Sequence, residues 1–331
     1  MVTTDDEKEI IMQKNALQII GENFNATRRI KATSPRILVD GGKAMLKYRN
    51  LAGDDTFLDV SSVYPEDPKE LRKTQITHIA QAMRIKDMDY ISWIVMAQVE
   101  AGATIIDVCI DEIAVDPNER HEWMKWIIPV VQGMTDLPLA IDSSDSKTIE
   151  AGLSVYDTTK SRPAINSVNL EDGRQDLIPM AREFNAMLFA NASGRETMPN
   201  NAEERVENLK QIMKMMDDDD IPMKDRFLDP LAFPVGAGGD FAKHYLDAVR
   251  MIHEEYPDVH IFGGHSNTSF GLPQRKVINE AFCILAVIAG CDTLMIDPIL
   301  NSPSIFNQFH LANEALMGRD EMCMNYIMSH R

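Results

Sequence analysis

The feature that most constrains the fold is a unit that recurs eight times along the 331 residues. Each unit is a short apolar run, then a polar tip, then a stretch with the helical spacing of apolar residues. In the clearest unit, the run ending at Phe262 breaks at Gly263 and Gly264, and polar residues up to Asn267 precede a helical pattern. Continuous apolar runs are typical of parallel strands that are buried on both faces. Eight such units predict an α/β fold, a single (β/α)8 TIM barrel.

Strands and helices are predicted to alternate along the chain. The strands are expected at residues 16–20, 104–108, 138–141, 164–165, 186–190, 226–228, 259–262 and 293–296. The longer helices are expected at residues 87–102, 119–134, 172–184, 202–216, 240–254 and 305–317. Two open sheets of Rossmann type are the competing architecture, but no G-x-G-x-x-G follows the first strand.

One domain comprising residues 1–331 is predicted, with two additions to the barrel. Residues 26–86 are irregular and rich in Asp, Pro and Gly, so we expect a loop insertion with short elements after the first strand. Residues 318–331 are expected to form a Met-rich C-terminal extension.

Composition limits the expected partners and compartment. The formal net charge of −18 repels phosphate backbones and anionic lipids, so neither nucleic acid nor a membrane is expected as a partner. No apolar run reaches spanning length, and the acidic start is unlike a secretory signal. The four cysteines lack C-x-x-C spacing, which favours reduced thiols and a cytoplasmic protein.

The predicted strands end in acids and amides. These residues are Glu22, Asn23, Asp107, Asp142, Asn166, Asn191, Asp229, Asn267 and Asp297. In a barrel the carboxyl ends of the strands converge on one mouth. Lys and Arg are missing from this set, which disfavours a phosphate-binding mouth. Carboxylates accept paired N–H bonds and amides both donate and accept, so the set suits a flat heterocycle with an amino-pyrimidine edge, such as a pterin.

Two other interpretations of the strand ends remain open. Asp and Asn often cap the helix that follows a strand. For any single position, a helix cap explains the residue about as well as a contact with a ligand does. Clustered oxygens could also hold a divalent cation. No H-x-H or H-E-x-x-H spacing marks a catalytic zinc, and we expect no metal site.

Several of these motifs together resemble a known family. The segments INSVN at 165–169, FLDPL at 227–231 and GGHSNTSFG at 263–271 are similar to those of pterin-binding enzymes. More narrowly, they resemble the methyltetrahydrofolate:corrinoid protein methyltransferases, which are related to the folate domain of cobalamin-dependent methionine synthase. IGENFN, AGATIIDV and AIDSSD match as well and occur in the same order. Dihydropteroate synthase is similar in fold, but its Ser-Arg-Lys after the seventh strand is absent here.

The resemblance implies roles for individual residues. It implies that Asn267 reaches the pterin N5 and that Asp229 bonds to the pterin ring. A proton relayed through Asp229 or Asp142 would serve the reaction, and Asp229 is predicted as the second catalytic residue. The pterin-binding set that it implies, together with the strand-end residues, is Asp142, Asn166, Asp229, Asn267, Gly264, Ser266, Arg275, Asp107 and Asn191. The chain departs from the acetogenic members of the family at Cys109, at Phe270 and in the long insertion.

The implied reaction is methyl transfer between tetrahydrofolate N5 and the cobalt of a corrinoid. A partner corrinoid protein is expected to supply the cobalt, and the chain is expected to form a homodimer. The insertion favours transfer from methylcorrinoid to tetrahydrofolate, as in demethylation pathways. The reverse direction, as in acetogenesis, a metal-dependent lyase or hydrolase on the same barrel, and a non-catalytic folate-binding protein are the alternatives.

A basic group lies just after the first strand, at Arg28, Arg29 and Lys31. It could capture the glutamate carboxylates of folate or a phosphate of the corrinoid. The alternative, which we favour from the sequence, is a solvated face of the insertion.

Overall fold

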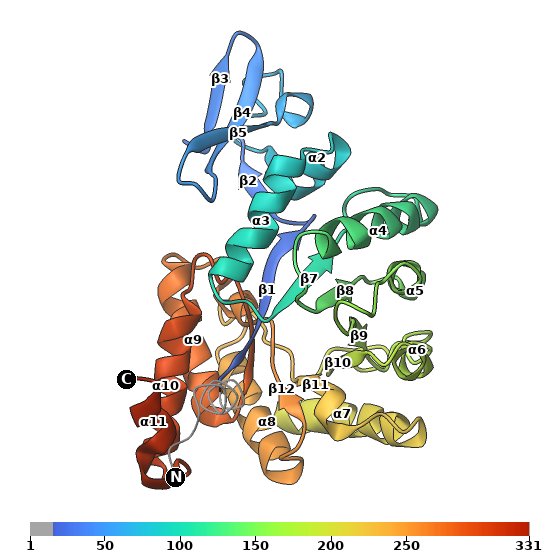
Figure 1. Cartoon of the computed structure of the whole chain (residues 1–331), viewed down its shortest axis with the longest axis vertical. Coiled ribbons are helices and arrows are strands. Elements are labelled where there is room, and N and C mark those ends of the chain that lie inside the picture. The colour runs from blue at the N-terminus through green and yellow to red at the C-terminus, as the bar shows by residue number, and fades with distance from the viewer. Residues whose placement is uncertain (1–15, 331) are drawn as a thin grey trace. The chain divides into compact units, whose positions relative to one another are not determined.

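A computed structural model describes residues 16–330 of the chain, and its centre is one eight-stranded sheet (Figure 1). The strands are β1 (Gln18–Asn25), β7 (Ile105–Cys109), β8 (Leu139–Asp142), β9 (Ala164–Val168), β10 (Met187–Asn191), β11 (Arg226–Asp229), β12 (His260–Ile261) and β13 (Thr293–Ile296). Their order is β12-β11-β10-β9-β8-β7-β1-β13, and a parallel bridge between Gly264 and Met295 joins the two outer members. The predicted TIM-barrel fold is confirmed.

Helices follow the strands as the apolar periodicity predicts. They are α3 (Met88–Glu100), α4 (Pro117–Gln132), α5 (Ser146–Leu153), α6 (Leu177–Glu183), α7 (Ala202–Asp218), α8 (Phe241–Glu255), α9 (Arg275–Ala289) and α10 (Pro303–Leu316). Side-chain caps fix where two of these helices begin. Asp116 accepts from Asn118 N–H before α4, and Asp145 accepts from Lys147 N–H before α5. Pro179 lies in the first turn of α6, which begins at Leu177. Its missing N–H therefore removes no hydrogen bond from the helix.

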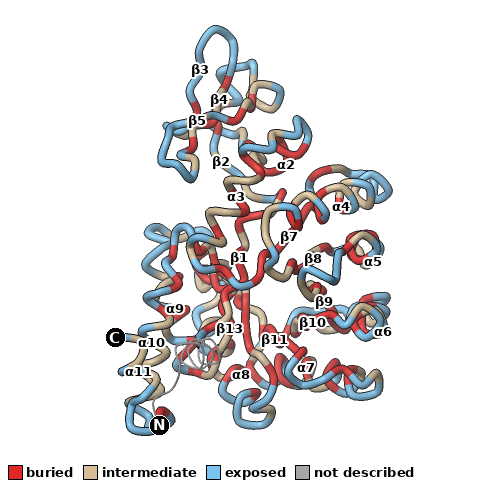
Figure 2. Tube along the Cα trace, viewed as in Figure 1, coloured by how far each residue is buried: buried red, intermediate tan, exposed pale blue. Residues whose placement is uncertain are grey.

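Contacts group the described chain into two compact units. The N-terminal unit comprises residues 21–100 and 105–166, and the C-terminal unit comprises residues 16–20, 101–104 and 167–330. The single domain of residues 1–331 stays a prediction. In the N-terminal unit, Figure 2 shows β7 buried throughout, whereas the turn between β3 and β4 is exposed.

The insertion at residues 26–86 contains more regular structure than a loop. Strands β2 (Arg29–Lys31) and β6 (Gln75–Thr77) pair at its base. Strands β3 (Ile37–Asp40), β4 (Lys43–Arg49) and β5 (Asp55–Asp59) form an antiparallel sheet, followed by η1 (Ser61–Val63), and α2 (His78–Arg84) comes after β6. The two-residue turn between β3 and β4 is Gly41-Gly42, with φ of +54° and +80°, as a tight hairpin of twisted strands requires.

The small sheet is fixed to α3 by aromatic packing. The ring of Tyr48 in β4 lies 4.7 Å from that of Tyr90 and 4.8 Å from that of Trp93, between ring centroids. Leu46 and Leu58 are buried beneath the same sheet. This arrangement gives the insertion its own apolar core.

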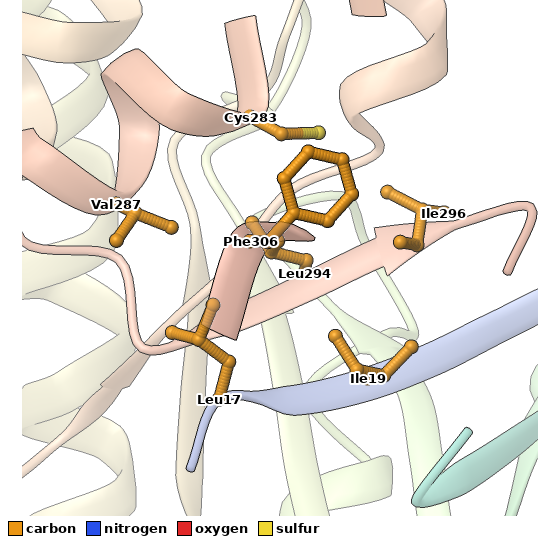
Figure 3. Close-up of a cluster of buried hydrophobic side chains, with 7 residues drawn as sticks. All are labelled: Leu17, Ile19, Cys283, Val287, Leu294, Ile296 and Phe306. Carbon is orange, nitrogen blue, oxygen red and sulfur yellow. The ribbon is translucent and has the colours of Figure 1, made fainter. Parts of the chain in front are cut away.

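One buried cluster in the C-terminal unit joins the start of β1 to the last third of the chain (Figure 3). Its members are Leu17, Ile19, Cys283, Val287, Leu294, Ile296 and Phe306. Leu17 and Ile19 precede or open β1, and Phe306 comes from α10, so residues nearly 290 positions apart pack together. The C-terminal extension continues from α10 as η4 (Glu321–Cys323) and α11 (Met324–Met328).

Candidate active site

Asp107 lies at the centre of a polar cluster in the N-terminal unit. Its side chain is fully buried in β7, and Asn166 Nδ2 donates to its Oδ1 at 3.0 Å. Strand register sets Asn166 opposite Asp142 on the neighbouring strand. Burial, and next the charge of Asp142, raise the pKa of Asp107 well above its usual range. The protonated form of Asp107 is therefore favoured by its surroundings, and its Oδ1 is already engaged by Asn166.

The end of β1 contributes two more polar residues to the N-terminal unit, of which Glu22 belongs to this cluster. The charge of Glu22 also raises the pKa of Asp107, so the two carboxyl groups are neighbours. Asn23 is buried; its N–H donates to Gln98 Oε1 at 2.9 Å, while its own Oδ1 has no hydrogen-bond partner among the described residues. A buried oxygen without a partner is costly unless a ligand or water satisfies it. We call Glu22, Asp107, Asp142 and Asn166 the acid–amide cluster.

Asp111 is a polar residue at this end of the sheet that the sequence patterns do not reveal. Its Oδ1 accepts from Ser143 Oγ at 2.5 Å, and its Oδ2 accepts from Ser144 N–H at 2.9 Å and from Ser144 Oγ at 2.7 Å. These bonds hold the segment that follows Asp142. The only signal in the sequence is the strand-end position of Asp111, four residues after Asp107.

Asn191 and Asp229 form a second set, in the C-terminal unit. Strand register sets them opposite one another at the ends of β10 and β11. Asn191 Nδ2 donates to Ser167 Oγ at 2.8 Å, and Asp229 Oδ1 accepts from Leu231 N–H at 2.7 Å. Register and these local bonds fix the orientation of both side chains.

Burial raises the pKa of Asp229 to about 7, against hydrogen bonds from the N–H groups of Leu231 and Gly264 and the charge of Arg205, which lower it. Arg205 is itself buried in α7, where it donates to the carbonyl of Asn201 at 2.7 Å. The sequence analysis missed Arg205, because a cation inside a helical pattern carries no sign of burial. A carboxyl group with this pKa can take or give a proton near neutral pH.

The predicted residues after β12 share one compact loop, in which η3 (His265–Ser269) is a 3-10 helix. A Cβ at Gly264 would lie 2.9 Å from Asn267 Nδ2, so any other residue there would force that carboxamide to move. Arg275 Nε donates to Ser269 Oγ at 2.9 Å, and its Nη2 donates to the carbonyl of Ser266 at 2.9 Å. Arg275 therefore fixes the loop, while the Asn267 side chain stays partly exposed.

His265, in the same loop, is expected to make the free energy of unfolding depend on pH. Its ring is fully buried against Tyr245, with Nε2 3.2 Å from the hydroxyl oxygen, and burial lowers its pKa to about 3. The folded chain keeps it neutral, so its contribution is present above about pH 6.5 and is lost as pH falls toward 3. The contribution of His265 to the free energy of unfolding should fall by about 1.4 kcal/mol per pH unit in that window.

Urea unfolding at pH 7.5 and 4.5 measures this dependence. His265→Gln should flatten the pH slope by about one proton, whereas His253→Gln, at an exposed position on α8, should leave it unchanged. Equal slopes in the wild type and His265→Gln would contradict the assignment.

Local backbone bonds occupy some acids near the strand ends, although the helix caps here come from residues outside the predicted strand-end set. Asp297 Oδ1 accepts from Leu300 N–H at 3.0 Å, a local turn bond. Asp145 caps α5, and its carboxylate also accepts from Thr148 Oγ1 at 2.8 Å. Asp107 and Asn166 instead bond to each other across strands.

Metal and membrane features were sought across residues 16–330. In that range no three His, Cys, Asp or Glu side chains are grouped to hold a metal ion. None of the described helices is both long enough and apolar enough to cross a membrane.

Comparison with known proteins gives matches of two kinds. Residues 78–297 match the model of a family described as pterin binding enzymes. A methylcorrinoid:tetrahydrofolate methyltransferase of Eubacterium limosum is 31% identical over 258 residues, which cover 76% of this chain and 91% of the relative.

Solved dihydropteroate synthases are similar in fold alone. That of Vibrio fischeri ES114 gives a TM-score of 0.55 at 17% identity, over 72% of this chain and 91% of that one. The synthase of Yersinia pestis with a pterine-sulfa conjugate gives a TM-score of 0.53 at 14% identity. The match covers 71% of this chain and 90% of that one.

Proposed function

The chain belongs to the pterin-binding enzyme family, and on this premise we propose that it transfers a methyl group from a methylcorrinoid to N5 of tetrahydrofolate. The observation that carries the proposal is the 31% identity to a methylcorrinoid:tetrahydrofolate methyltransferase across nine-tenths of that relative. The acid–amide cluster supports it, because a buried acid and an oriented amide suit the edge of a pterin.

In this proposal the acid–amide cluster binds the amino-pyrimidine edge. Asn166 uses one N–H to reach Asp107 and keeps its other N–H and its oxygen for the ligand. Asp142 would accept from the ring's N–H groups. Gly264, Ser266, Arg275, Asn191 and Asp229 complete the proposed pterin-binding set, with Arg275 acting through the loop that it fixes.

Asn267 and Asp229 are the proposed catalytic residues. Transfer forms the N5–CH3 bond, breaks the Co–CH3 bond with both electrons left on cobalt, and releases the proton of N5. Asn267 can donate to or accept from N5 as its charge changes, which stabilises the transition state more than the ground state. Asp229, with a pKa of about 7, accepts the released proton directly or through water. A partner corrinoid protein would supply the cobalt.

The test combines the purified chain with tetrahydrofolate and methylcobalamin. Formation of 5-methyltetrahydrofolate and of cob(I)alamin, followed by chromatography and absorbance, is the expected result. Assays started from 5-methyltetrahydrofolate and cob(I)alamin measure the reverse rate, and a faster reverse rate would overturn the direction. If the chain binds the folate but transfers no methyl group in either direction, it is a folate-binding protein without this activity.

Asp107 gives a prediction about folate binding. Because Asp107 accepts from Asn166, Asp107→Asn keeps an acceptor of the same shape and should change the Kd for tetrahydrofolate by less than about threefold. Asp107→Ala leaves the Asn166 N–H without its acceptor and should weaken binding by about tenfold or more. Isothermal titration calorimetry measures both values, with thermal unfolding as the control for folding. Equal losses in the two variants would show that Asp107 is needed as a charge.

A further inference from the structure

Arg205 is a buried cation at a position that disfavours positive charge. It lies in the first turn of α7, where the helix dipole is positive, and its side chain is fully buried. Its Nη1 donates to the carbonyl of Asn201 at 2.7 Å, whereas its Nη2 has no hydrogen-bond partner among residues 16–330. The neighbouring Glu204 is exposed and accepts from Asn200 N–H. A guanidinium in these surroundings is costly unless a further anion offsets its charge.

The guanidinium contacts the turn that follows β11. Arg205 Nε donates to the carbonyl of Leu231 at 3.5 Å, and its Cζ lies 4.9 Å from the ring centroid of Phe233. The N–H of Leu231 donates to Asp229 Oδ1 at 2.7 Å. One residue of the turn therefore bonds to Arg205 through its carbonyl and to Asp229 through its N–H.

Leu231 adopts a backbone conformation that leucine disfavours. Its φ is +68°, in the left-handed region where a Cβ crowds the backbone. Such a conformation persists only where neighbouring contacts fix it, and it is common at functional sites. Here the contacts come from Asp229 on one side of the residue and from Arg205 on the other. The orientation of the Asp229 carboxyl group is therefore linked to Arg205.

Three other titratable groups near Asp229 carry no charge at neutral pH. Burial raises the pKa of Tyr245, on α8, and of Cys291, after α9, and it lowers the pKa of His265 to about 3. Arg205 therefore supplies the charge that favours the ionised carboxyl group of Asp229.

We propose that Arg205 is a positioning residue for Asp229: it fixes the turn at Leu231 and balances the charge of the carboxylate. The inference rests on the proposed function, in which Asp229 accepts the proton of N5. A carboxyl group must be ionised before it can accept that proton, and burial alone favours its protonated form. The cation of Arg205 offsets this effect, so that the ionised form is populated at neutral pH. Because Arg205 is fully buried, it acts through Asp229 and not by contact with the folate.

The test follows methyl transfer from methylcobalamin to tetrahydrofolate between pH 5.5 and 9, in single turnovers of the full chain. The wild-type rate should show a midpoint near pH 7. Arg205→Gln should move this midpoint upward by about one pH unit, because the favourable charge is gone, and the rate at pH 6 should fall about tenfold. Arg205→Met keeps the apolar stem of the side chain, should move the midpoint in the same way, and serves if Arg205→Gln does not fold.

Arg205→Lys separates the two parts of the role. It keeps the charge, so the midpoint should stay within about 0.3 pH units of the wild type. It lacks the planar group that contacts Leu231 and Phe233, so kcat should fall about tenfold while KM for tetrahydrofolate changes by less than about twofold. An unchanged kcat would exclude the positioning role.

Two other cations provide the controls. Lys214→Gln removes an exposed charge of the same helix, 3.4 Å from Asp218, and should keep the wild-type profile. Arg226→Gln removes another buried arginine, bonded to Asp217 at 2.7 Å, and should lower the melting temperature without moving the midpoint. An equal shift of the midpoint in Arg226→Gln would attribute the shift to lost stability and overturn the inference.

The remaining outcomes separate this inference from the proposed function. A wild-type midpoint near pH 7 that neither Arg205→Gln nor Arg205→Met moves would overturn the role of Arg205 and leave that of Asp229 standing. Methyl transfer without such a midpoint would overturn Asp229 as the proton acceptor, and this inference with it. No transfer by the wild type would overturn the proposed function as well.

Discussion

Replacing Asn267 with Ala is expected to lower kcat for methyl transfer by about 100- to 1000-fold. The affinity for tetrahydrofolate should change less than it does in Asp142→Ala or Asn166→Ala. The reason is that a hydrogen bond to N5 strengthens as the charge on N5 changes, whereas bonds to the ring edge act equally before and during transfer. A group that acts only in the transition state lowers kcat without raising KM.

Gly264→Ala provides an independent check on Asn267. The added Cβ would lie 2.9 Å from Asn267 Nδ2, so the carboxamide must move while its chemistry is retained. Gly264→Ala should therefore share the kcat defect in milder form. Single-turnover rates and calorimetric Kd values separate the two effects. Equal loss of binding in Asn267→Ala, Asp142→Ala and Asn166→Ala, with an unchanged rate for bound folate, would refute the role of Asn267.

Asp229→Asn is expected to lower the rate of transfer to tetrahydrofolate by about 100-fold and to remove its pH dependence near neutrality. In the wild type the rate should rise with pH through about 7, because only the ionised carboxyl accepts the proton of N5. In the reverse direction the protonated carboxyl is the active form, so that rate should fall over the same range. An unchanged pH profile in Asp229→Asn would exclude Asp229 as the proton acceptor.

Stability provides a second readout for Asp229. Its pKa in the folded chain is raised from 3.8 to about 7, so its contribution is present below about pH 3.8 and lost as pH rises through 7. Asp229→Asn should remove this loss, and its free energy of unfolding should decrease less between pH 5 and 8. Asp225→Asn, at a buried position next to the same strand, controls for the loss of one acid.

The sequence predicted the strand–helix alternation well because apolar runs flanked by polar tips directly reflect burial in a parallel sheet. Residues 293–296 were placed correctly, as β13. The first strand was wrong at both ends: it was expected at 16–20, but β1 runs from Gln18 to Asn25. Backbone pairing extends it through polar residues, and Ala26 N–H still donates to the carbonyl of Cys109 just beyond its end.

The insertion was the largest departure from expectation. Its hairpin signal was present in the sequence, as Asp40-Gly41-Gly42 between alternating apolar residues, but the density of Asp, Pro and Gly obscured it. In the site, Asp107, Asp142 and Asn166 were predicted from their positions at the ends of strands. The strand register does bring their side chains together. The raised pKa of Asp107 and the burial of Arg205 depend on tertiary structure, which no local pattern encodes.

The buried cluster of Figure 3 bears on how the chain is synthesised and folded. Leu17 and Ile19 are translated long before their partners Leu294, Ile296 and Phe306. Contacts of such long sequence separation form slowly and expose apolar surface in the meantime. The nascent chain therefore leaves one edge of β1 without its neighbour until residues 293–296 have emerged, and a product truncated before residue 293 would keep that edge open to aggregation.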